Sequence, residues 1–329
     1  MSDSHWSTHK EAAAGYWHVR LMLIFFRILP IIFLRLIAFP VGFCYFLFSK
    51  RTRHQSRCYL QRVGKKLSPL PHILAFSLAL VEKVEAWGGR VSFRRIHFQD
   101  DDIGDLMSRL ERGEGAFLVS SHLGNMEFIR ALAGFNQTGV SREIPVNAIV
   151  DFTVTAHFNR MLNELNPRSV MRLINARDMG PETIILLLER LAAGELVVIA
   201  GDRTSPNAES RTLPLAFLGD EAFFPYGPFF LAALMKVPVY SVFALRQKDV
   251  SLSSHYTMHI HRAPVSFDCT RHERDSRIAE LARWFASLLE RYCKEHPYQW
   301  YNFYDFWHTA AAPSVPAAAD AGEEMCKQP

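Results

Sequence analysis

The chain has 329 residues, of which 49% are hydrophobic, with 25 Phe and a formal net charge of +4. A chain of this length and composition can bury a full core, in one large domain or two, without help from disulfides. The small net charge does not indicate a nucleic-acid partner, and we expect none.

Residues 1–16 are polar and carry no strong structural signal. Residues 17–48 are nearly all apolar and long enough to cross a bilayer, and no small-residue cleavage site follows them. Two arginines and two prolines interrupt this stretch: Arg27, Pro30, Arg35 and Pro40. We expect a kinked helix that spans the membrane or lies in its interface, with a buried core helix as the alternative. Its expected interface anchors are Tyr16, Trp17 and Tyr45.

A strongly basic segment, residues 50–66, follows at once and contains no acidic residue. Beside an apolar helix, such a segment predicts a patch that binds anionic lipid and keeps the rest of the chain on the cytoplasmic side. A solvated helix face and a surface for an acidic carrier protein are the alternatives. The five cysteines are scattered and form no CxxC, so we expect reduced thiols.

Helical and strand patterns then alternate along the chain. Helices are expected at residues 74–87, 103–111, 126–133, 156–165, 181–193, 229–236 and 271–295, and strands at 91–98, 116–119, 146–150, 195–200, 213–218, 239–245 and 255–261. This order predicts a single α/β domain, residues 67–308, whose mixed, mainly parallel sheet is flanked by helices. The domain follows an N-terminal membrane-associated unit, residues 17–66. Residues 309–329 are Ala/Pro-rich and are expected to be a disordered tail.

Residues 115–133 contain the side chains best suited to catalysis. A buried strand leads to His122, Gly124-Asn125 provides a turn, and a helix is expected from residue 126. His122 would therefore lie at the carboxyl end of a strand, where open α/β sheets bind their ligands. Glu127, in the first turn of that helix, could hold one imidazole nitrogen and leave the other as a base. The alternative is a capping histidine with a solvated glutamate.

Three further segments also follow predicted strands. Arg160 lies on the helix expected after residue 150, Gly201-Asp202-Arg203 closes another strand, and residues 224–228 open an apolar helix. Each has an ordinary structural explanation: a surface arginine, a local ion pair and a Pro-containing helix start.

Taken in order after an apolar and basic N-terminus, these segments resemble the bacterial lysophospholipid acyltransferase superfamily, in the branch of the lipid A biosynthesis (lauroyl/myristoyl) acyltransferases. His122 to Glu127 matches the catalytic His-x4-Asp/Glu motif in its His-x-Gly-Asn-x-Glu form. Asp202-Arg203 matches the branch's Asp-Arg motif, and residues 217–228 resemble its next block. The sequence departs from the branch at Met126, where Trp is common, and at Gly201 and Thr204, which replace Gln and Arg.

The resemblance implies an enzyme that moves a fatty acyl chain from a thioester, on acyl carrier protein or coenzyme A, to a hydroxyl or amine of a lipid or glycolipid acceptor. It also implies no metal or redox cofactor, and a place in the bacterial inner membrane with the catalytic domain on the cytoplasmic face. His122 would be the general base and Glu127 the group that orients it, with an oxyanion bound by backbone N–H groups at the Gly124-Asn125 turn. The implied substrate-binding residues are Asn125, Arg160, Asp202 and Arg203.

Two rival functions remain open. A lipid hydrolase would need a nucleophile elbow, and the sequence contains no GxSxG, although Ser120 and Ser121 precede His122. A non-catalytic membrane scaffold would need only the N-terminal segment.

Overall fold

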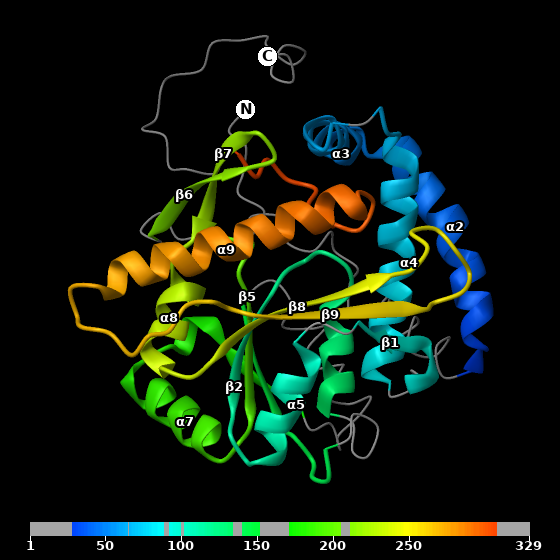
Figure 1. Cartoon of the computed structure of the whole chain (residues 1–329). Coiled ribbons are helices and arrows are strands. Elements are labelled where there is room, and N and C mark those ends of the chain that lie inside the picture. Colours follow the sequence, from blue (N-terminus) through cyan, green and yellow to red (C-terminus); the bar gives the residue numbers. More distant parts are fainter. Residues whose placement is uncertain are drawn as a thin grey trace.

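The computed structural model describes residues 28–64, 66–88, 92–99, 102–133, 140–151, 171–204 and 211–307 (Figure 1). Several predictions lie outside these residues: the polar N-terminus, the first part of the apolar segment with Tyr16 and Trp17, the helix at 156–165 with Arg160, and the tail.

A seven-stranded sheet forms the centre of the described part of the chain, in the order β1-β9-β8-β2-β5-β3-β4. The strands are β1 (Ile96–Phe98), β2 (Ala116–Ser120), β3 (Val146–Val150), β4 (Met171–Asn175), β5 (Leu196–Ala200), β8 (Val239–Arg246) and β9 (Tyr256–Arg262). All neighbours are parallel except β8 and β9, which pair antiparallel. The prediction of an α/β domain with a mixed, mainly parallel sheet is confirmed.

Alternating side chains of the strands face two separate cores. Phe117 and Val119 of β2 point into a large core together with helices α8 (Gly227–Met235) and α9 (Arg274–Glu295). Leu118 points into the other core, together with α5 (Ile103–Glu111). This is the two-residue period of a strand covered on both faces, and it explains why β2 is a continuous apolar run.

Two further elements complete this part of the fold. Helix α7 (Pro181–Ala192) begins with a proline at its first position and precedes β5. Strands β6 (Thr212–Phe217) and β7 (Asp220–Pro225) form a separate antiparallel hairpin against α9. Short 3₁₀ helices are η2 (Phe93–Arg95), η3 (Met126–Ala133) and η4 (Ala176–Asp178).

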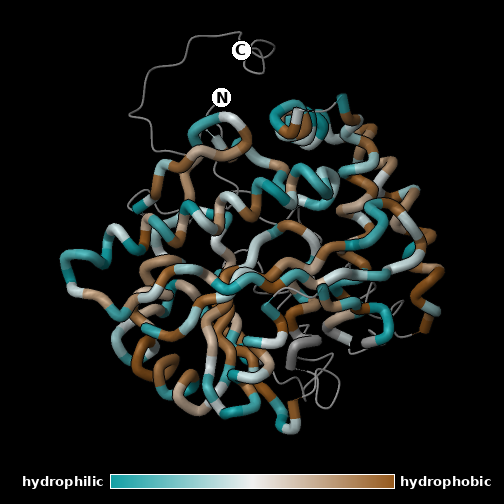
Figure 2. The backbone as a smooth tube through the Cα atoms, in the orientation of Figure 1, coloured by the Kyte–Doolittle hydropathy of each residue, from teal (hydrophilic) through white to brown (hydrophobic). Residues whose placement is uncertain are grey.

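The N-terminal region contributes α2 (Ile31–Phe48), α3 (Lys50–Arg62) and α4 (Pro69–Trp87), with α2 and α4 side by side at one edge of the molecule (Figure 1). Helix α2 begins after Pro30 and contains Pro40. Among the described residues it is the one helix long and apolar enough to cross a membrane, with a mean hydropathy of 2.2. Figure 2 shows its apolar residues along the outer edge, and hydrophilic residues on α3.

Most of the predicted helices and strands are present, and the structure differs from the sequence predictions in three respects. The helix expected at 126–133 is the 3₁₀ helix η3, and within the strand expected at 91–98 Phe93–Arg95 is the 3₁₀ helix η2 and Ile96–Phe98 is strand β1. Strands β4 and β7 were not predicted. Cys44, Cys269 and Cys293 are free thiols, but Cys58 is disulfide-bonded, so the prediction of reduced thiols is wrong there.

Candidate active site

The candidate site lies where two neighbouring parallel strands end. Strands β2 and β5 pair in register, with Ser120 opposite Ala200. His122 and Asp202 each come two residues after these paired ends, so the register brings them together across 80 residues of sequence. This is the carboxyl edge of a parallel sheet, where α/β proteins place their ligands.

Asp202 holds His122 by two hydrogen bonds. Its Oδ1 is 2.8 Å from His122 Nδ1, and its Oδ2 accepts from the His122 backbone N–H at 2.8 Å. A third donor, Trp300 Nε1, lies 3.0 Å from the same Oδ2. Because the carboxylate accepts at Nδ1, the proton of the neutral ring belongs on Nδ1, and Nε2 carries the lone pair. The Asp202 side chain is 1% exposed and that of His122 is 28% exposed, so a substrate can reach the ring but not the carboxylate.

The charges around this pair favour a neutral imidazole and an ionised carboxylate. Burial lowers the pKa of His122, and the positive charges of Arg203 and Lys83 act in the same direction, against the opposing influence of Asp202. Burial alone would raise the pKa of Asp202, but the interactions with His122 and Arg203 outweigh it and lower the pKa. A neutral ring beside a carboxylate is the state in which a histidine can accept a proton.

Glu127 is not the carboxylate at Nδ1, so that part of the sequence prediction is wrong. Leu123 and Gly124 form isolated β-bridges to Trp300 and Ala244, with Gly124 in the left-handed backbone region, and η3 begins only at Met126. This path of the chain carries Glu127 towards α4, where its carboxylate pairs with Lys83 at 3.0 Å. Glu127 was expected to hold one imidazole nitrogen, and the carboxylate that holds Nδ1 in this structure is that of Asp202.

The Gly124-Asn125 turn is held by the sheet, which rules out the predicted oxyanion donors in this conformation. Gly124 N–H donates to Gln299 O at 2.8 Å, and Asn125 N–H donates to Ala244 O at 2.9 Å. Gly124 has φ +73°, and an added Cβ would lie 2.0 Å from Ala244 O, so only glycine fits here. Both N–H groups are therefore occupied by carbonyl groups outside the turn.

The Asn125 side chain stabilises the same turn. It is buried, and its Oδ1 accepts from the Glu127 N–H at 3.3 Å while its Nδ2 lies 3.5 Å from Ala79 O of α4. Its role in substrate binding stays a prediction.

Arg203 follows Asp202 directly and faces the C-terminal aromatic segment, residues 298–307. It donates to Tyr301 O at 2.9 Å and lies 6.0 Å from the ring centroid of Tyr304. Arg160, the other arginine expected to bind substrate, lies outside the described residues.

The two serines before His122 are engaged by the backbone. Ser120 Oγ donates to Val242 O at 3.1 Å, and Ser121 Oγ accepts from Leu123 N–H at 3.2 Å. Neither contact resembles a nucleophile activated by a base.

Sequence reasoning missed two residues of the site, Lys83 and Trp300. Trp300 belongs to the aromatic segment and packs in the large core, and its bond to Asp202 spans 98 residues. Lys83 lies in a predicted helix 44 residues before Glu127. No local pattern links either residue to the histidine motif.

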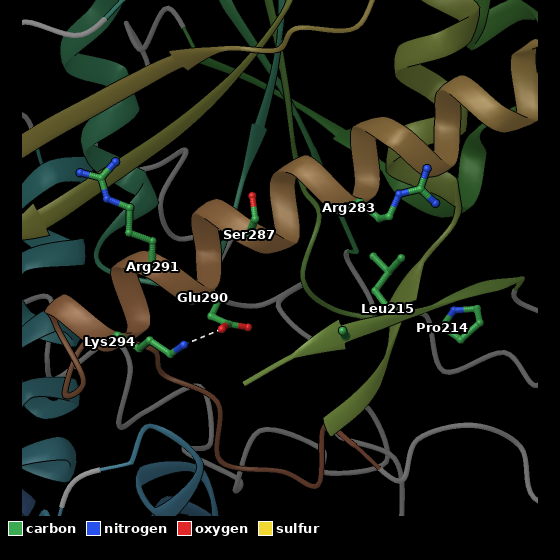
Figure 3. A pocket seen from close by; sticks show the side chains of 8 residues that line it. Pro214, Leu215, Arg283, Ser287, Glu290, Arg291 and Lys294 are labelled. Carbon is green, nitrogen blue, oxygen red and sulfur yellow. Dashed lines mark hydrogen bonds and ion pairs between the residues drawn. The ribbon is translucent and has the colours of Figure 1, made fainter. Parts of the chain in front are cut away.

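An open groove of about 540 Å³ lies elsewhere, between the β6–β7 hairpin and α9 (Figure 3). Glu290 on its wall binds Lys294 at 2.6 Å and also accepts from Leu218 N–H of the hairpin turn. These contacts attach the hairpin to α9, and neither His122 nor Asp202 lines the groove.

Comparison with known proteins gives one informative match. A search of curated proteins finds no match to this chain. The family model described as bacterial lipid A biosynthesis acyltransferase, however, matches residues 2–309, which include the whole described structure. The protein therefore belongs to the bacterial lipid A biosynthesis acyltransferase family.

Proposed function

We propose that the protein is a membrane-bound acyltransferase that moves a fatty acyl chain from an acyl thioester to a hydroxyl or amine of a lipid or glycolipid acceptor. The observation that carries this proposal is the partly exposed His122 ring, held at Nδ1 by the buried carboxylate of Asp202. Membership of the family supports acyl transfer to a lipid acceptor. The donor is a thioester of acyl carrier protein or of coenzyme A.

In the proposed reaction His122 Nε2 takes the proton of the acceptor hydroxyl as its oxygen attacks the thioester carbonyl. The tetrahedral intermediate then expels the thiolate, which receives the proton from the imidazolium. The products are an acylated acceptor and a free thiol. Asp202 fixes the ring and stabilises the imidazolium while it exists, a role comparable to that of the aspartate in a catalytic triad.

Positive charge near the ring would serve two further steps, the binding of a substrate phosphate and the stabilisation of the oxyanion. The Arg203 guanidinium lies next to the His122–Asp202 pair and could bind a phosphate of the donor or acceptor, as could Arg160. Since the Gly124 and Asn125 N–H groups are occupied, cationic side chains such as Arg203 are the better candidates to stabilise the oxyanion.

We also propose that α2 and α3 hold the enzyme on the cytoplasmic face of the bacterial inner membrane. The outer surface of α2 exposes large apolar side chains: Ile32, Phe33, Leu36, Ile37, Val41, Phe43, Tyr45, Leu47 and Phe48. The next helix exposes Lys50, Arg51 and Arg57. An apolar face beside a cationic helix matches the interface of a bilayer that contains anionic lipid.

Membranes containing the protein test the proposal. Labelled acyl carrier protein and labelled acyl coenzyme A would be offered separately, with host lipid extract as acceptor, and products measured by lipid mass spectrometry. We expect a new acylated lipid with the wild type and none with His122→Ala, which folds and binds membrane normally. Product formation by His122→Ala at the wild-type rate would disprove the mechanism.

A further inference from the structure

Helix α2 packs against α4 along a narrow stripe of its surface (Figure 1). The buried residues of α2 are Arg35, Ala38 and Gly42, which recur at the spacing of one helix face. In the first half of α2, Arg35 pairs with Glu85 of α4. In the second half, Gly42 lies so close to α4 that an added Cβ would be 2.6 Å from Ser77 Oγ. The two helices therefore run antiparallel and touch over both halves of α2.

Helix α4 is in turn packed on the catalytic domain along its length. The Phe76 ring lies 5.5 Å from that of Tyr301, and Glu82 pairs with Arg246 of β8 at 3.3 Å. Helix α4 also contacts η3, which follows the histidine motif. Since α4 lies between α2 and the domain, the axis of α2 runs alongside the domain surface rather than away from it.

The partners of Arg35 show which part of the domain lies level with α2. Arg35 donates to Leu252 O at 3.0 Å and to Ser254 Oγ at 2.7 Å, both in the connection between β8 and β9. Glu85 also pairs with Arg95 of η2. If α2 crossed a bilayer, these loops and ion pairs would lie at the depth of the hydrocarbon, where irregular backbone is not tolerated next to lipid. The packing of α2 is therefore incompatible with a path across the bilayer.

The rest of the α2 surface is the exposed apolar face described above, and α3 continues it with positive charge. Arg53 of α3 donates to Phe46 O and to Leu47 O, the second at 2.7 Å, so α3 is fixed at the end of α2. Helix α3 contains no acidic residue, and its exposed cations include Lys50, Arg51 and Arg57. An apolar face next to a cationic helix matches the boundary between the acyl chains and the anionic headgroups of one leaflet.

We propose that α2 lies in the plane of the membrane, with its outer face among the acyl chains of one leaflet and α3 at the anionic headgroups. The inference rests on the proposed membrane attachment and adds its geometry. Its consequence is that both ends of α2 remain on the side of the membrane that holds the catalytic domain.

Spin labels at two points of the outer face test this orientation. Cys44 is a free and exposed thiol, and the exposed Phe33 lies eleven residues earlier, which is about three turns and the same face of the helix. Full-length protein with Cys269→Ser would carry one nitroxide, at Cys44 or, in a Cys44→Ser background, at Phe33→Cys. Its depth would be measured in vesicles of phosphatidylethanolamine and phosphatidylglycerol, from relaxation by oxygen and by a nickel chelate.

For a helix in the membrane plane, the two labels should lie at the same depth to within about 5 Å, whereas a helix along the membrane normal would separate them by about 16 Å. A label at Arg283→Cys, an exposed position on α9, is the control and should report water. All three positions are exposed, so the labels should leave the fold intact.

The charge of α3 is tested by vesicle binding. Arg51→Gln and Arg57→Gln should each weaken binding to the same anionic vesicles by about fivefold and leave binding to pure phosphatidylcholine vesicles unchanged. Arg283→Gln is the matched control, because it removes an exposed arginine from α9, and it should bind both kinds of vesicle like the wild type.

Three results would overturn the proposal, and each has a different meaning. Label depths about 16 Å apart would show that α2 crosses the bilayer. Labels at both positions that neither oxygen nor the chelate reaches would show that protein, such as a second copy of the chain, covers the face. Absence of binding to either kind of vesicle would refute the membrane attachment itself. None of these readouts depends on acyl transfer, which His122→Ala tests separately.

Discussion

At the scale of single residues, Asp202 is the centre of the site. Its two oxygens accept three hydrogen bonds, two from His122 and one from Trp300, and its side chain is 1% exposed. A buried carboxylate is stable only when such donors replace its lost water. The orientation of the base therefore depends on a tryptophan that is itself buried in the core.

Replacement of Trp300 by Phe should remove one donor from Asp202 while keeping an aromatic ring in the core. A hydrogen bond to a charged group contributes about 1.5–3 kcal/mol, so we expect kcat to fall by about ten- to a hundredfold. Trp307→Phe is the control, because Trp307 Nε1 donates at 3.3 Å to a neutral carbonyl, that of Phe217, within the same cluster. Steady-state rates at equal amounts of folded protein should show a large loss only for Trp300→Phe. Equal losses in both variants would mean that Trp300 acts only through packing.

At the scale of elements, α2 is tied to the domain by a charged residue in the middle of its apolar sequence. Arg35 is buried, donates to Leu252 O and Ser254 Oγ, and pairs with Glu85 of α4. The cost of an arginine in an apolar helix is thus offset by protein partners. One side of α2 packs on α4, and the opposite side is the apolar surface described above.

Helices α3 and α4 are joined to the active-site segment through His72. The His72 Nε2 donates to Trp300 O at 2.8 Å, and since a carbonyl can only accept, Nδ1 accepts from Ser56 Oγ at 2.9 Å. Burial lowers the pKa of His72 to about 4, against a smaller opposing contribution from the bond to Trp300. The ring is therefore neutral in the folded protein at physiological pH.

This neutral ring makes stability depend on pH. Between about 6.5 and about 4 the unfolded chain binds a proton at His72 that the folded chain does not, so the free energy of unfolding must fall as the pH falls. At 1.36 kcal/mol per unit, His72 should account for a loss of about 2 kcal/mol between pH 7.5 and pH 5. Urea unfolding in micelles at the two pH values should show a smaller pH dependence for His72→Gln. An equal pH dependence in both proteins would exclude this role.

The elements also show what the sequence could and could not predict. Strand ends were located well, because a buried parallel strand is a short apolar run, and this placed His122 and Asp202 each at a carboxyl end. That the two residues meet depends on β2 lying next to β5, which no local pattern reveals. Glu127 was paired with His122 on the expectation of an α-helix after the turn. The β-bridges at residues 123–124 and the 3₁₀ helix that follows gave a different geometry.

At the scale of the whole molecule, the helices that we propose to face lipid are connected to the candidate active site. Tyr59 of α3 packs edge-on against Trp300 with ring centroids 5.0 Å apart, and Trp300 in turn donates to Asp202. Helix α4 lies between α2 and the η3 segment and contacts both. The α2–α3 surface is therefore connected to the His122–Asp202 pair through Tyr59 and Trp300. This arrangement suits an enzyme whose acceptor stays in the membrane.

The central claim, that His122 is the base and Asp202 the group that orients it, is tested most directly by comparing Asp202→Asn with Glu127→Gln. Acyl transfer by membranes containing each variant would be measured with labelled thioester donors and host lipid extract. We predict that Asp202→Asn lowers the rate by about 10²–10⁴-fold, and by more than Glu127→Gln, because the amide can favour the wrong ring tautomer. A wild-type rate for Asp202→Asn, together with an inactive Glu127→Gln, would contradict the account and return the orienting role to Glu127.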